Sequence, residues 1–333
     1  MSSILVSSWW ISAQLIINEA KKKWLKYKIL SRQDNLFYII NKWKKIFFKS
    51  VDFWQNTSFW IKAANNKEIN YILANQFNIR IPQSIYINRE ELNTIDLEKL
   101  NLKFPVISKP IDWWHWDWVS INITNYNELK SWVEFSFFDS STNRVVIQEQ
   151  IKWDDHRILV IDWRVEAITK RVPPFIIWTW NKTIQELLDI ENSNPLRWKW
   201  WDHDAPMSKI RIDTELKETI KQQWYTLESI LKKWKKLTVR NNANLSSWWI
   251  AIDVTTLAHS EIKKEAEKMA KVLQLNLCAV DFLCTDISLP LIEWWWAIIE
   301  SWATPWIRMH HYPSKWTPIN VAKIILESAL NKK

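Results

Sequence analysis

The sequence predicts an α/β protein in which strands and helices alternate, and three observations support this fold class. Residues 4–6 read as a short apolar strand, 12–23 as a helix and 25–30 as a second strand. This order is a β-α-β unit, which predicts a small parallel sheet at the start of the chain. A second series of strands and helices follows between residues 65 and 149, and near the end one acidic residue interrupts each of two apolar strands.

The middle of the chain supplies the elements of the second series. Short apolar runs that are bounded by turn residues predict strands. We expect helices at 65–77 and 127–135, strands at 85–87, 104–110, 119–123 and 145–149, and two further strands at 157–161 and 164–168 that Asp162 and Trp163 join in a tight turn.

The composition includes 28 tryptophans and no glycine in 333 residues, whereas glycine usually fills about 7% of positions. The turn at Asp162 and Trp163 requires positive φ, which a residue with a Cβ adopts only at a steric cost. Either the protein carries an indole at all 28 sites, or tryptophan stands for glycine, because a glycine codon such as a reassigned stop codon has been read as tryptophan or because glycine has been replaced deliberately. We favour the second interpretation, because the run WWHWDW at 113–118 would expose a large apolar surface on a loop.

Charge and hydrophobicity indicate a globular enzyme of two or three domains. Hydrophobic residues make up 47% and charged residues 24% of the chain, and the net charge is +9. The lysines lie in stretches such as 21–23 and 232–236, which read as solvated helix faces rather than a binding stripe. No apolar run reaches the ~18 residues of a membrane span. We therefore expect a cytoplasmic protein that binds neither nucleic acid nor membrane, with Cys278 and Cys284 as buried free thiols.

Lys109 lies in an apolar strand that precedes a polar loop, residues 112–118. With glycine at its tryptophan positions, this loop would be glycine-rich and mobile. Backbone N–H groups approach a phosphate closely only where no side chain intervenes. A fixed lysine beside such a loop therefore indicates a nucleotide-phosphate site, and a hairpin loop without a ligand is the alternative.

Asp281 and Glu300 are carboxylates within apolar strands, where a charge is costly unless a cation accompanies it. Two such strands side by side would hold Mg²⁺ against a triphosphate. Structural salt bridges explain the same pattern equally well, so both interpretations stay open on spacing alone.

Four segments resemble the ATP-grasp module of cyanophycin synthetase. Residues 239–255 read VRNNANLSSWWIAIDVT and resemble that family's RNANLSTGGxAIDVT signature, with Trp248 and Trp249 on its two glycines. Residues 109–119, KPIDWWHWDWV, resemble its KPxDGxHGxGV loop, and residues 296–300 and 303–310 resemble its GAIIE and AAPGxRMH segments. The resemblance covers residues 67–320 and implies the ATP-grasp fold.

The resemblance implies a role for each matching residue. Arginines would stabilise the transferred phosphate, carboxylates would bind Mg²⁺, and further polar residues would bind ATP or the substrate. The implied catalytic residues are Arg157, Arg240 and Arg308; the ATP-binding residues are Lys67, Lys109, Asp112, His115, Asp117, Gln148, Glu149 and Ile151; the metal ligands are Asp281 and Glu300; and the substrate-binding residues are Arg171, Asn242, Asn244 and His310.

One position departs from the family pattern. The family usually has Asn two residues after the metal glutamate, whereas Trp302 stands there in this chain, in a position where we expect glycine. One expected Mg²⁺ ligand is therefore missing, which makes a non-catalytic nucleotide-binding protein one of the alternatives.

The implied activity is the ATP- and Mg²⁺-dependent ligation of a carboxylate to an amine through an acylphosphate, with small amino-acid or peptide substrates. The opening unit and residues 29–37 look more like the pre-ATP-grasp region of glutathione-synthetase modules in bifunctional enzymes, so a γ-glutamyl peptide ligase is an equal alternative. The expected domains are a pre-ATP-grasp domain at 1–64, a small lid subdomain at 65–150 and a large subdomain at 151–333 with an insertion around 173–245. The sequence leaves open which substrates are joined and whether the chain forms a homo-oligomer.

Overall fold

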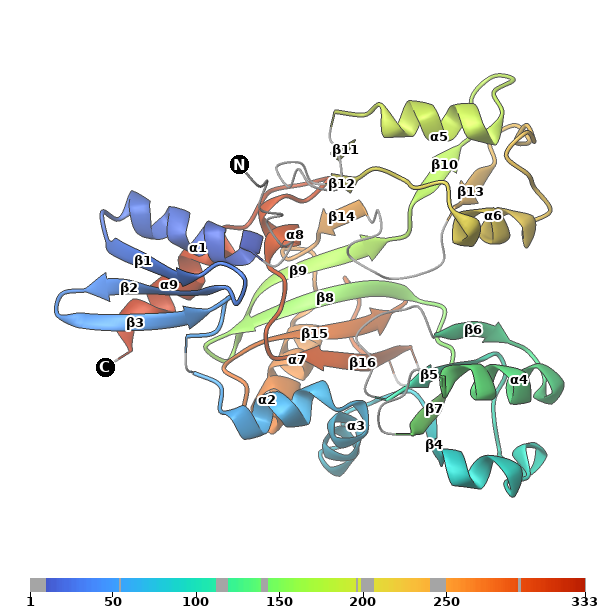
Figure 1. Ribbon diagram of the computed structural model, residues 1–333, viewed down its shortest axis with the longest axis horizontal. Helices are drawn as coiled ribbons and strands as arrows, with labels where there is room; N and C mark the ends of the chain where they lie inside the picture. The colour runs from blue at the N-terminus through green and yellow to red at the C-terminus, as the bar shows by residue number, and fades with distance from the viewer. Residues whose placement is uncertain are drawn as a thin grey trace. The chain divides into compact units, whose positions relative to one another are not determined.

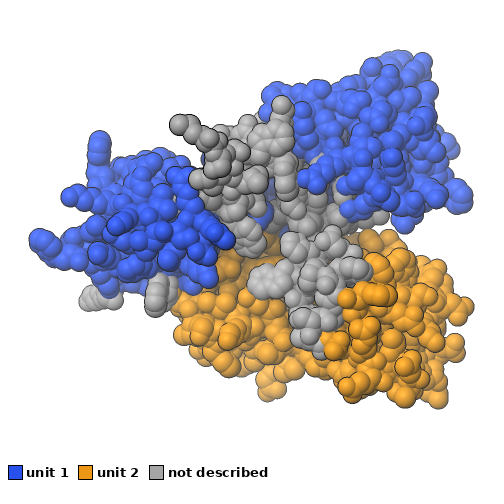
Figure 2. All heavy atoms as spheres, viewed as in Figure 1, with its two compact units in different colours: residues 1–54, 167–256, 306–333 blue, residues 55–166, 257–305 orange. Residues whose placement is uncertain are grey.

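The computed structural model describes residues 10–53, 55–111, 119–138, 143–195, 197–198, 207–239, 250–292 and 295–332 (Figure 1). They divide into two compact units, which Figure 2 distinguishes by colour. Unit 1 comprises residues 1–54, 167–256 and 306–333, and unit 2 comprises residues 55–166 and 257–305. None of the described helices is both long and apolar enough to cross a membrane.

Unit 1 begins with α1 (Trp10–Lys22) and the antiparallel sheet β1-β2-β3, formed by Lys26–Ser31, Leu36–Asn41 and Lys44–Lys49. One face of this sheet is buried, and its Phe37 and Phe48 rings stack with centroids 4.9 Å apart. Helix α1 packs against β1 and against α9 (Val321–Asn331). The strand expected at residues 4–6 lies outside the described residues. The three described strands are antiparallel, because short turns connect each strand to the next.

A second part of unit 1 surrounds its own apolar core. Strands β10 (Phe175–Ile177) and β13 (Lys236–Thr238) pair antiparallel, and α5 (Ile184–Asn192) and α6 (Thr214–Lys221) accompany them. Helix α5 begins with a capping box, in which the Thr183 and Glu186 side chains satisfy each other's backbone N–H groups. Leu188, Leu216 and Leu237 are fully buried in this core. The short strands β11 (Arg197–Trp198) and β12 (Met207–Ser208) pair parallel.

Unit 1 also contains the pairing of β14 (Ile250–Asp253) with residues 169–172 of β9 (Arg164–Val172). The short helix α8 (Arg308–His311) lies near β14. The Oγ1 atom of Thr169 on β9 is 2.8 Å from Nδ1 of His310 on α8. This hydrogen bond fixes the buried His310 ring on the face of β9 that carries Thr169.

Unit 2 contains the antiparallel sheet β4-β7-β5-β6, which is formed by Ser84–Asn88, Arg144–Glu149, Val106–Pro110 and Ser120–Ile123. Helix α4 (Tyr126–Ser136) packs on it through Leu129 and Val133, with the 3₁₀ turns Arg89–Asn93 and Leu97–Lys99 at the edge of this core. The predicted strands at 85–87, 104–110, 119–123 and 145–149 and the helix at 127–135 are confirmed within a few residues at each end.

Unit 2 also contains three antiparallel strands, β8 (Asp154–Ile161), β15 (Leu277–Cys284) and β16 (Trp296–Trp302), in the order β8-β15-β16. Every residue of the central strand β15 is buried. Helix α7 (Ser260–Val272) packs against β8 and β15, and helices α2 (Ser58–Asn65) and α3 (Lys67–Gln76) pack against β16. The helix expected at 65–77 is thus confirmed as α3, and Cys278 and Cys284 are buried free thiols as predicted.

Five tryptophans have the left-handed backbone conformation that favours glycine. Their φ angles run from 57° to 74°, and they are Trp24, Trp163, Trp224, Trp234 and Trp316. Asp162 and Trp163 have φ of 50° and 66°, so the hairpin between β8 and β9 is the predicted tight turn with positive φ at both central residues.

Two of these tryptophans end helices at the position where glycine is usual. After α1, the N–H groups of Trp24 and Leu25 donate to the carbonyls of Lys21 and Ala20 at 2.9 Å. After α6, Trp224 and Tyr225 make the same pair of hydrogen bonds. This Schellman arrangement requires a left-handed residue where the indole stands. Backbone geometry therefore supports glycine at these sites.

Candidate active site

Three of the predicted site residues lie side by side across the sheet of unit 2. Asp281 on β15 is opposite Arg157 on β8 and opposite Glu300 on β16. Directly opposed residues of antiparallel strands point to the same face. The register therefore gathers the two predicted metal ligands and one predicted catalytic arginine into one cross-strand row. We call this row, Arg157, Asp281 and Glu300, the acidic row.

Asp281 and Arg157 form a buried, bidentate ion pair. The Arg157 Nε and Nη2 atoms donate to Asp281 Oδ1 and Oδ2, each at 2.8 Å, and both side chains are less than a tenth exposed. Two parallel charge-assisted hydrogen bonds fix the carboxylate plane. The indole Nε1 of Trp302 also donates to Asp281 Oδ2, at 3.2 Å, and the Arg157 guanidinium carbon lies 5.8 Å from the Trp302 ring centroid.

Glu300 has its own cation. Lys67 Nζ lies 3.2 Å from Glu300 Oε1, and the Lys67 side chain is one-tenth exposed. Lys67 is the first residue of α3, whose start is fixed because the Asn66 side chain accepts hydrogen bonds from the N–H groups of Glu68 and Ile69. Salt bridges were one of the two interpretations of the carboxylates in these strands. Both salt bridges are present, Arg157–Asp281 and Lys67–Glu300.

Lys109 is held by a chain of hydrogen bonds. Its Nζ donates to Gln148 Oε1 at 3.0 Å, and Gln148 Nε2 donates to the Tyr71 hydroxyl at 2.7 Å and to Ser84 Oγ at 3.0 Å. The Tyr71 hydroxyl then donates to the carbonyl oxygen of Ile299 at 2.6 Å. Ile299 is the residue before Glu300, so these hydrogen bonds connect Lys109 to β16, the strand that carries Glu300.

Burial and the nearby positive charge of Lys67 lower the pKa of Lys109 to about 8, and the Glu300 carboxylate opposes this shift. Both effects disfavour an ammonium ion until an anion approaches. Burial also raises the pKa of Tyr71, which keeps its hydroxyl protonated as a hydrogen-bond donor.

Sequence reasoning did not identify Tyr71. A signal was present, because Tyr71 follows Lys67 by four residues and the two therefore share one face of a helix. An aromatic residue at helical spacing is usually part of a core, so the pattern alone did not distinguish a hydrogen-bonding role.

We predict that Tyr71→Phe lowers the free energy of unfolding by about 1–3 kcal/mol, because it deprives the Ile299 carbonyl and Gln148 of a buried partner. Chemical denaturation measures this change. Tyr86→Phe is the matched control: among the described residues the Tyr86 hydroxyl has no hydrogen-bond partner, so its removal should leave stability nearly unchanged. Equal losses in the two variants would contradict a special role for Tyr71.

The remaining predicted residues of unit 2 lie at the end of β7 and just after it. Glu149 is the last residue of β7, and its N–H donates to the Gln83 carbonyl at 2.9 Å. Ile151 follows two residues later and is half-buried. Gln148 is buried and directly opposite Ser84 of β4.

The predicted substrate side divides between described and undescribed residues. In unit 1, Arg171 is buried on β9 two residues after Thr169, so both point to one face of that strand. His310 contacts Thr169 on this face, and Arg308 begins the same short helix. The other predicted residues lie outside the described residues, and they are Asp112, His115, Asp117, Arg240, Asn242 and Asn244.

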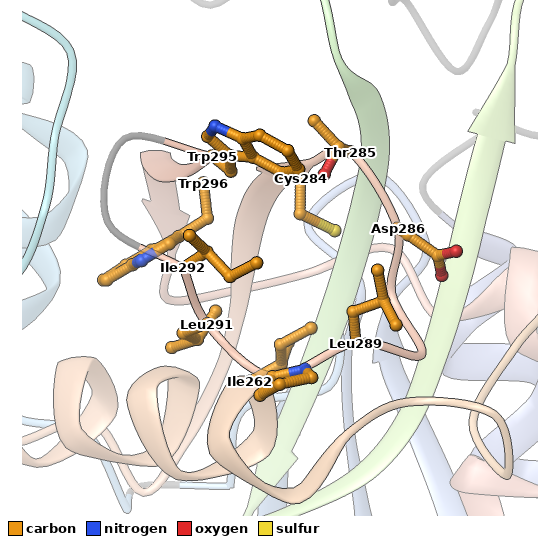
Figure 3. A pocket seen from close by; sticks show the side chains of 10 residues that line it. Ile262, Cys284, Thr285, Asp286, Leu289, Leu291, Ile292, Trp295 and Trp296 are labelled. Carbon is orange, nitrogen blue, oxygen red and sulfur yellow. The ribbon is translucent and has the colours of Figure 1, made fainter.

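A separate small cavity of unit 2 lies beside α7 and the loop that follows β15. Figure 3 shows Ile262, Leu291 and Trp295 around it, with the Cys284 thiol at its margin. The Cys284 Sγ atom is 3.6 Å from Nδ1 of His156. The cavity measures about 10 Å³, enough for about one water molecule. It is therefore too small for a nucleotide, and it does not include the acidic row.

Comparison with known proteins agrees with the resemblance seen in the sequence. The chain is 34% identical over 224 residues to cyanophycin synthetase of Crocosphaera subtropica, covering 67% of this chain and 26% of that protein. It is 26% identical over 328 residues to the glutathione biosynthesis bifunctional protein GshAB of Clostridium perfringens, covering 96% of this chain and 41% of that protein. No family model matches the sequence.

The fold agrees with that of a solved relative. The crystal structure of a bifunctional glutathione synthetase from Pasteurella multocida superimposes with a TM-score of 0.69 at 19% identity, covering 96% of this chain and 44% of that chain. The protein is thus an α/β chain with the ATP-grasp fold, and it resembles modules of cyanophycin synthetases and of bifunctional glutathione synthetases. It spans between a quarter and two fifths of the length of these curated relatives.

Proposed function

We propose that this ATP-grasp protein is an ATP- and Mg²⁺-dependent ligase that joins the carboxylate of one small amino-acid or peptide substrate to the amine of another. The observation that supports this most is the row of Arg157, Asp281 and Glu300, which gathers two carboxylates and an arginine on one face of a sheet. The relatives named cyanophycin synthetase and glutathione biosynthesis protein favour amide-bond formation as the reaction.

The acidic row suits Mg²⁺ by its chemistry. Mg²⁺ prefers oxygen ligands and is usually bound by one or two carboxylates, with phosphates and water completing its coordination. Asp281 and Glu300 are directly opposite each other on β15 and β16, so the row offers the two carboxylates that such a site needs. Asp281 and Glu300 would hold the ion, which would neutralise charge on the triphosphate.

The residues of this chain would act mainly by positioning and by charge. A substrate carboxylate oxygen would attack the γ-phosphorus of ATP, releasing ADP and forming an acylphosphate. The amine of the second substrate would then attack the acyl carbon and release inorganic phosphate. Lys109 and Arg157 would bind phosphate oxygens during the transfer, and no side-chain nucleophile is needed. We propose that Arg171 and His310 contact the substrates.

Two specific substrate classes are compatible with this site. A cyanophycin-synthetase-like ligase would extend an amino-acid polymer, whereas a glutathione-synthetase-like ligase would extend a γ-glutamyl peptide. Matches to relatives of both kinds extend over nearly the whole chain, so we rank the peptide ligase equal to the cyanophycin-type ligase. The Trp302 indole, which donates to Asp281, favours a third candidate, a nucleotide-binding protein without turnover.

Amine-dependent ADP release tests the proposal. The full chain would be incubated with ATP, Mg²⁺ and pairs of amino acids or γ-glutamyl peptides, and ADP would be measured. Hydroxylamine should trap the acylphosphate as a hydroxamate when the carboxylate substrate is present and the amine is omitted. ATP binding without either product would identify the non-catalytic protein, and absence of ATP binding would reject both proposals.

The lowered pKa of Lys109 predicts pH-dependent ATP binding. Below about pH 8 the ammonium is charged, so affinity for an ATP analogue should be nearly constant. Above that pH the free protein loses the proton while the bound anion retains it, so the dissociation constant should rise up to tenfold per pH unit. Calorimetry in buffers of different ionisation enthalpy should detect proton uptake on binding.

Lys109→Arg is the control for this pH dependence, because arginine stays charged throughout this range. Its binding should depend little on pH, whatever its absolute affinity. A wild-type affinity that stays flat between pH 7 and pH 10 would contradict a lowered pKa for Lys109.

A further inference from the structure

The outer face of the sheet β1-β2-β3 carries a group of lysines around two aromatic rings. In β2 the buried side chains of Phe37 and Ile39 alternate with partly exposed ones, and the register places the buried Phe48 of β3 opposite Phe37, on the same core face. The register aligns Lys28, Tyr38 and Phe47 in one cross-strand row and Lys26, Ile40 and Lys45 in the next. We call this face the basic sheet face: Lys26, Lys28, Tyr38, Ile40, Lys45, Phe47 and Lys49.

The aromatic rings lie at the centre of the basic sheet face. The Tyr38 and Phe47 rings are half-buried, with centroids 5.4 Å apart, and Lys45 Nζ lies 5.2 Å from the Tyr38 ring centroid. Because both rings are partly exposed, they can be reached from the outside. Lys26, Lys28, Lys45 and Lys49 are exposed around the two rings.

Charge is concentrated in this part of the chain. Residues 10–53 contain ten lysines and arginines but three acidic residues, so they carry most of the net charge of +9. No member of the basic sheet face is acidic. Such a surface attracts polyanions and loses affinity as salt screens it.

We propose that the basic sheet face binds single-stranded nucleic acid. Lysines alone would serve any polyanion, but two adjacent aromatic rings on neighbouring strands are what base stacking requires. The four lysines would contact phosphates around the stacked bases. None of these residues is a tryptophan, so the proposal holds whether tryptophan or glycine occupies the 28 sites. The sequence predicts no nucleic-acid binding, because the lysines are scattered along the chain. The proposal differs because the strand register brings Lys26, Lys28, Lys45 and Lys49 onto one face.

Fluorescence anisotropy with a labelled oligo-uridylate and the full chain tests the proposal. With four phosphate contacts, the dissociation constant should rise about 50-fold between about 50 and 200 mM salt. The variant Lys28→Glu/Lys45→Glu should bind at least tenfold more weakly than wild type. Because two phosphate contacts remain, its dissociation constant should rise only about sevenfold between about 50 and 200 mM salt. Tyr38→Leu/Phe47→Leu keeps apolar packing but removes both rings, and it should weaken binding by roughly tenfold or more.

Lys130→Glu/Lys264→Glu is the matched control, because it makes the same change of charge on exposed helical positions of unit 2. Its affinity should stay within about twofold of wild type at physiological salt. Thermal melts would verify folding, and the lysine pair decides the question if the leucine pair does not fold. The proposal is overturned if wild type fails to bind at low salt, if the control weakens binding equally, if loss of both rings has no effect, or if polyglutamate competes better than polyuridylate.

Discussion

Replacing five tryptophans by glycine is expected to raise the free energy of unfolding by about 5–10 kcal/mol. The five sites are Trp24, Trp163, Trp224, Trp234 and Trp316, which have positive φ. A residue with a Cβ loses roughly 1–2 kcal/mol in this conformation, and glycine does not. Because a typical domain is stable by only about 5–15 kcal/mol, the full set approaches its whole stability.

Urea denaturation of the two chains measures this difference. Trp132→Gly provides the matched control, because Trp132 lies inside α4 and is not among the residues with positive φ. Glycine inside a helix should lower stability by roughly 0.5–1 kcal/mol. If the five-site glycine variant has a lower free energy of unfolding than the starting chain, as is expected for Trp132→Gly, then positive φ at these sites is no evidence for glycine.

The intact mass of the natively expressed protein tests the same conclusion directly. Glycine at the tryptophan sites should give a mass several kilodaltons below 40.3 kDa. A peptide map across residues 109–119 would show whether the loop after Lys109 contains glycine. A native mass of 40.3 kDa would contradict codon reassignment and would leave indoles in the segment proposed to approach phosphate.

The second large effect is expected for Asp281→Asn, which should abolish amine-dependent ADP release and lower the free energy of unfolding by about 3–5 kcal/mol. The loss of stability follows because the substitution leaves the buried Arg157 guanidinium without its charge partner. The loss of activity follows because one of the two proposed metal ligands becomes a neutral amide. Denaturation and the ADP assay measure the two effects separately.

A paired replacement separates stability from catalysis. In Arg157→Met/Asp281→Leu, two apolar side chains replace the buried ion pair, so stability should return near the wild-type value while activity stays absent. Asp96→Asn is the surface control, because Asp96 pairs with an exposed lysine, Lys99, and should change neither quantity appreciably. Activity in the paired variant would exclude Asp281 and Arg157 from the proposed reaction.

Local pattern predicted most of the described strands and helices of unit 2, because its apolar runs are short and bounded by turn residues. It also placed Asp281 and Glu300 in apolar strands, but it left open whether they form a metal site or separate salt bridges. The opposition of Arg157 to Asp281 depends on the register of β8 against β15, and the opposition of Glu300 to Asp281 depends on Ile299, which bulges out of the pairing of β15 with β16. A register that depends on one bulged residue is not readable from spacing.

The hairpin of β2 and β3 was missed for a different reason. Its turn includes Lys42 and Trp43, with Lys42 at a φ of 54°. Asn or Asp followed by Gly between two apolar runs is the strongest short signal of a hairpin, and Lys42 followed by position 43 does not match it with either tryptophan or glycine. The basic sheet face depends on this hairpin, which is why the lysines looked scattered along the chain.

The left-handed tryptophans also bear on which cells can make this protein. A codon that one organism reads as glycine and most others read as a stop would end translation in an ordinary expression host before Trp9, releasing a peptide of eight residues. The gene would then be silent after transfer between species, and laboratory production would require a recoded version. The reassigned codon would thus confine expression of the intact chain to cells that read it as glycine, which is the residue that the left-handed turns require.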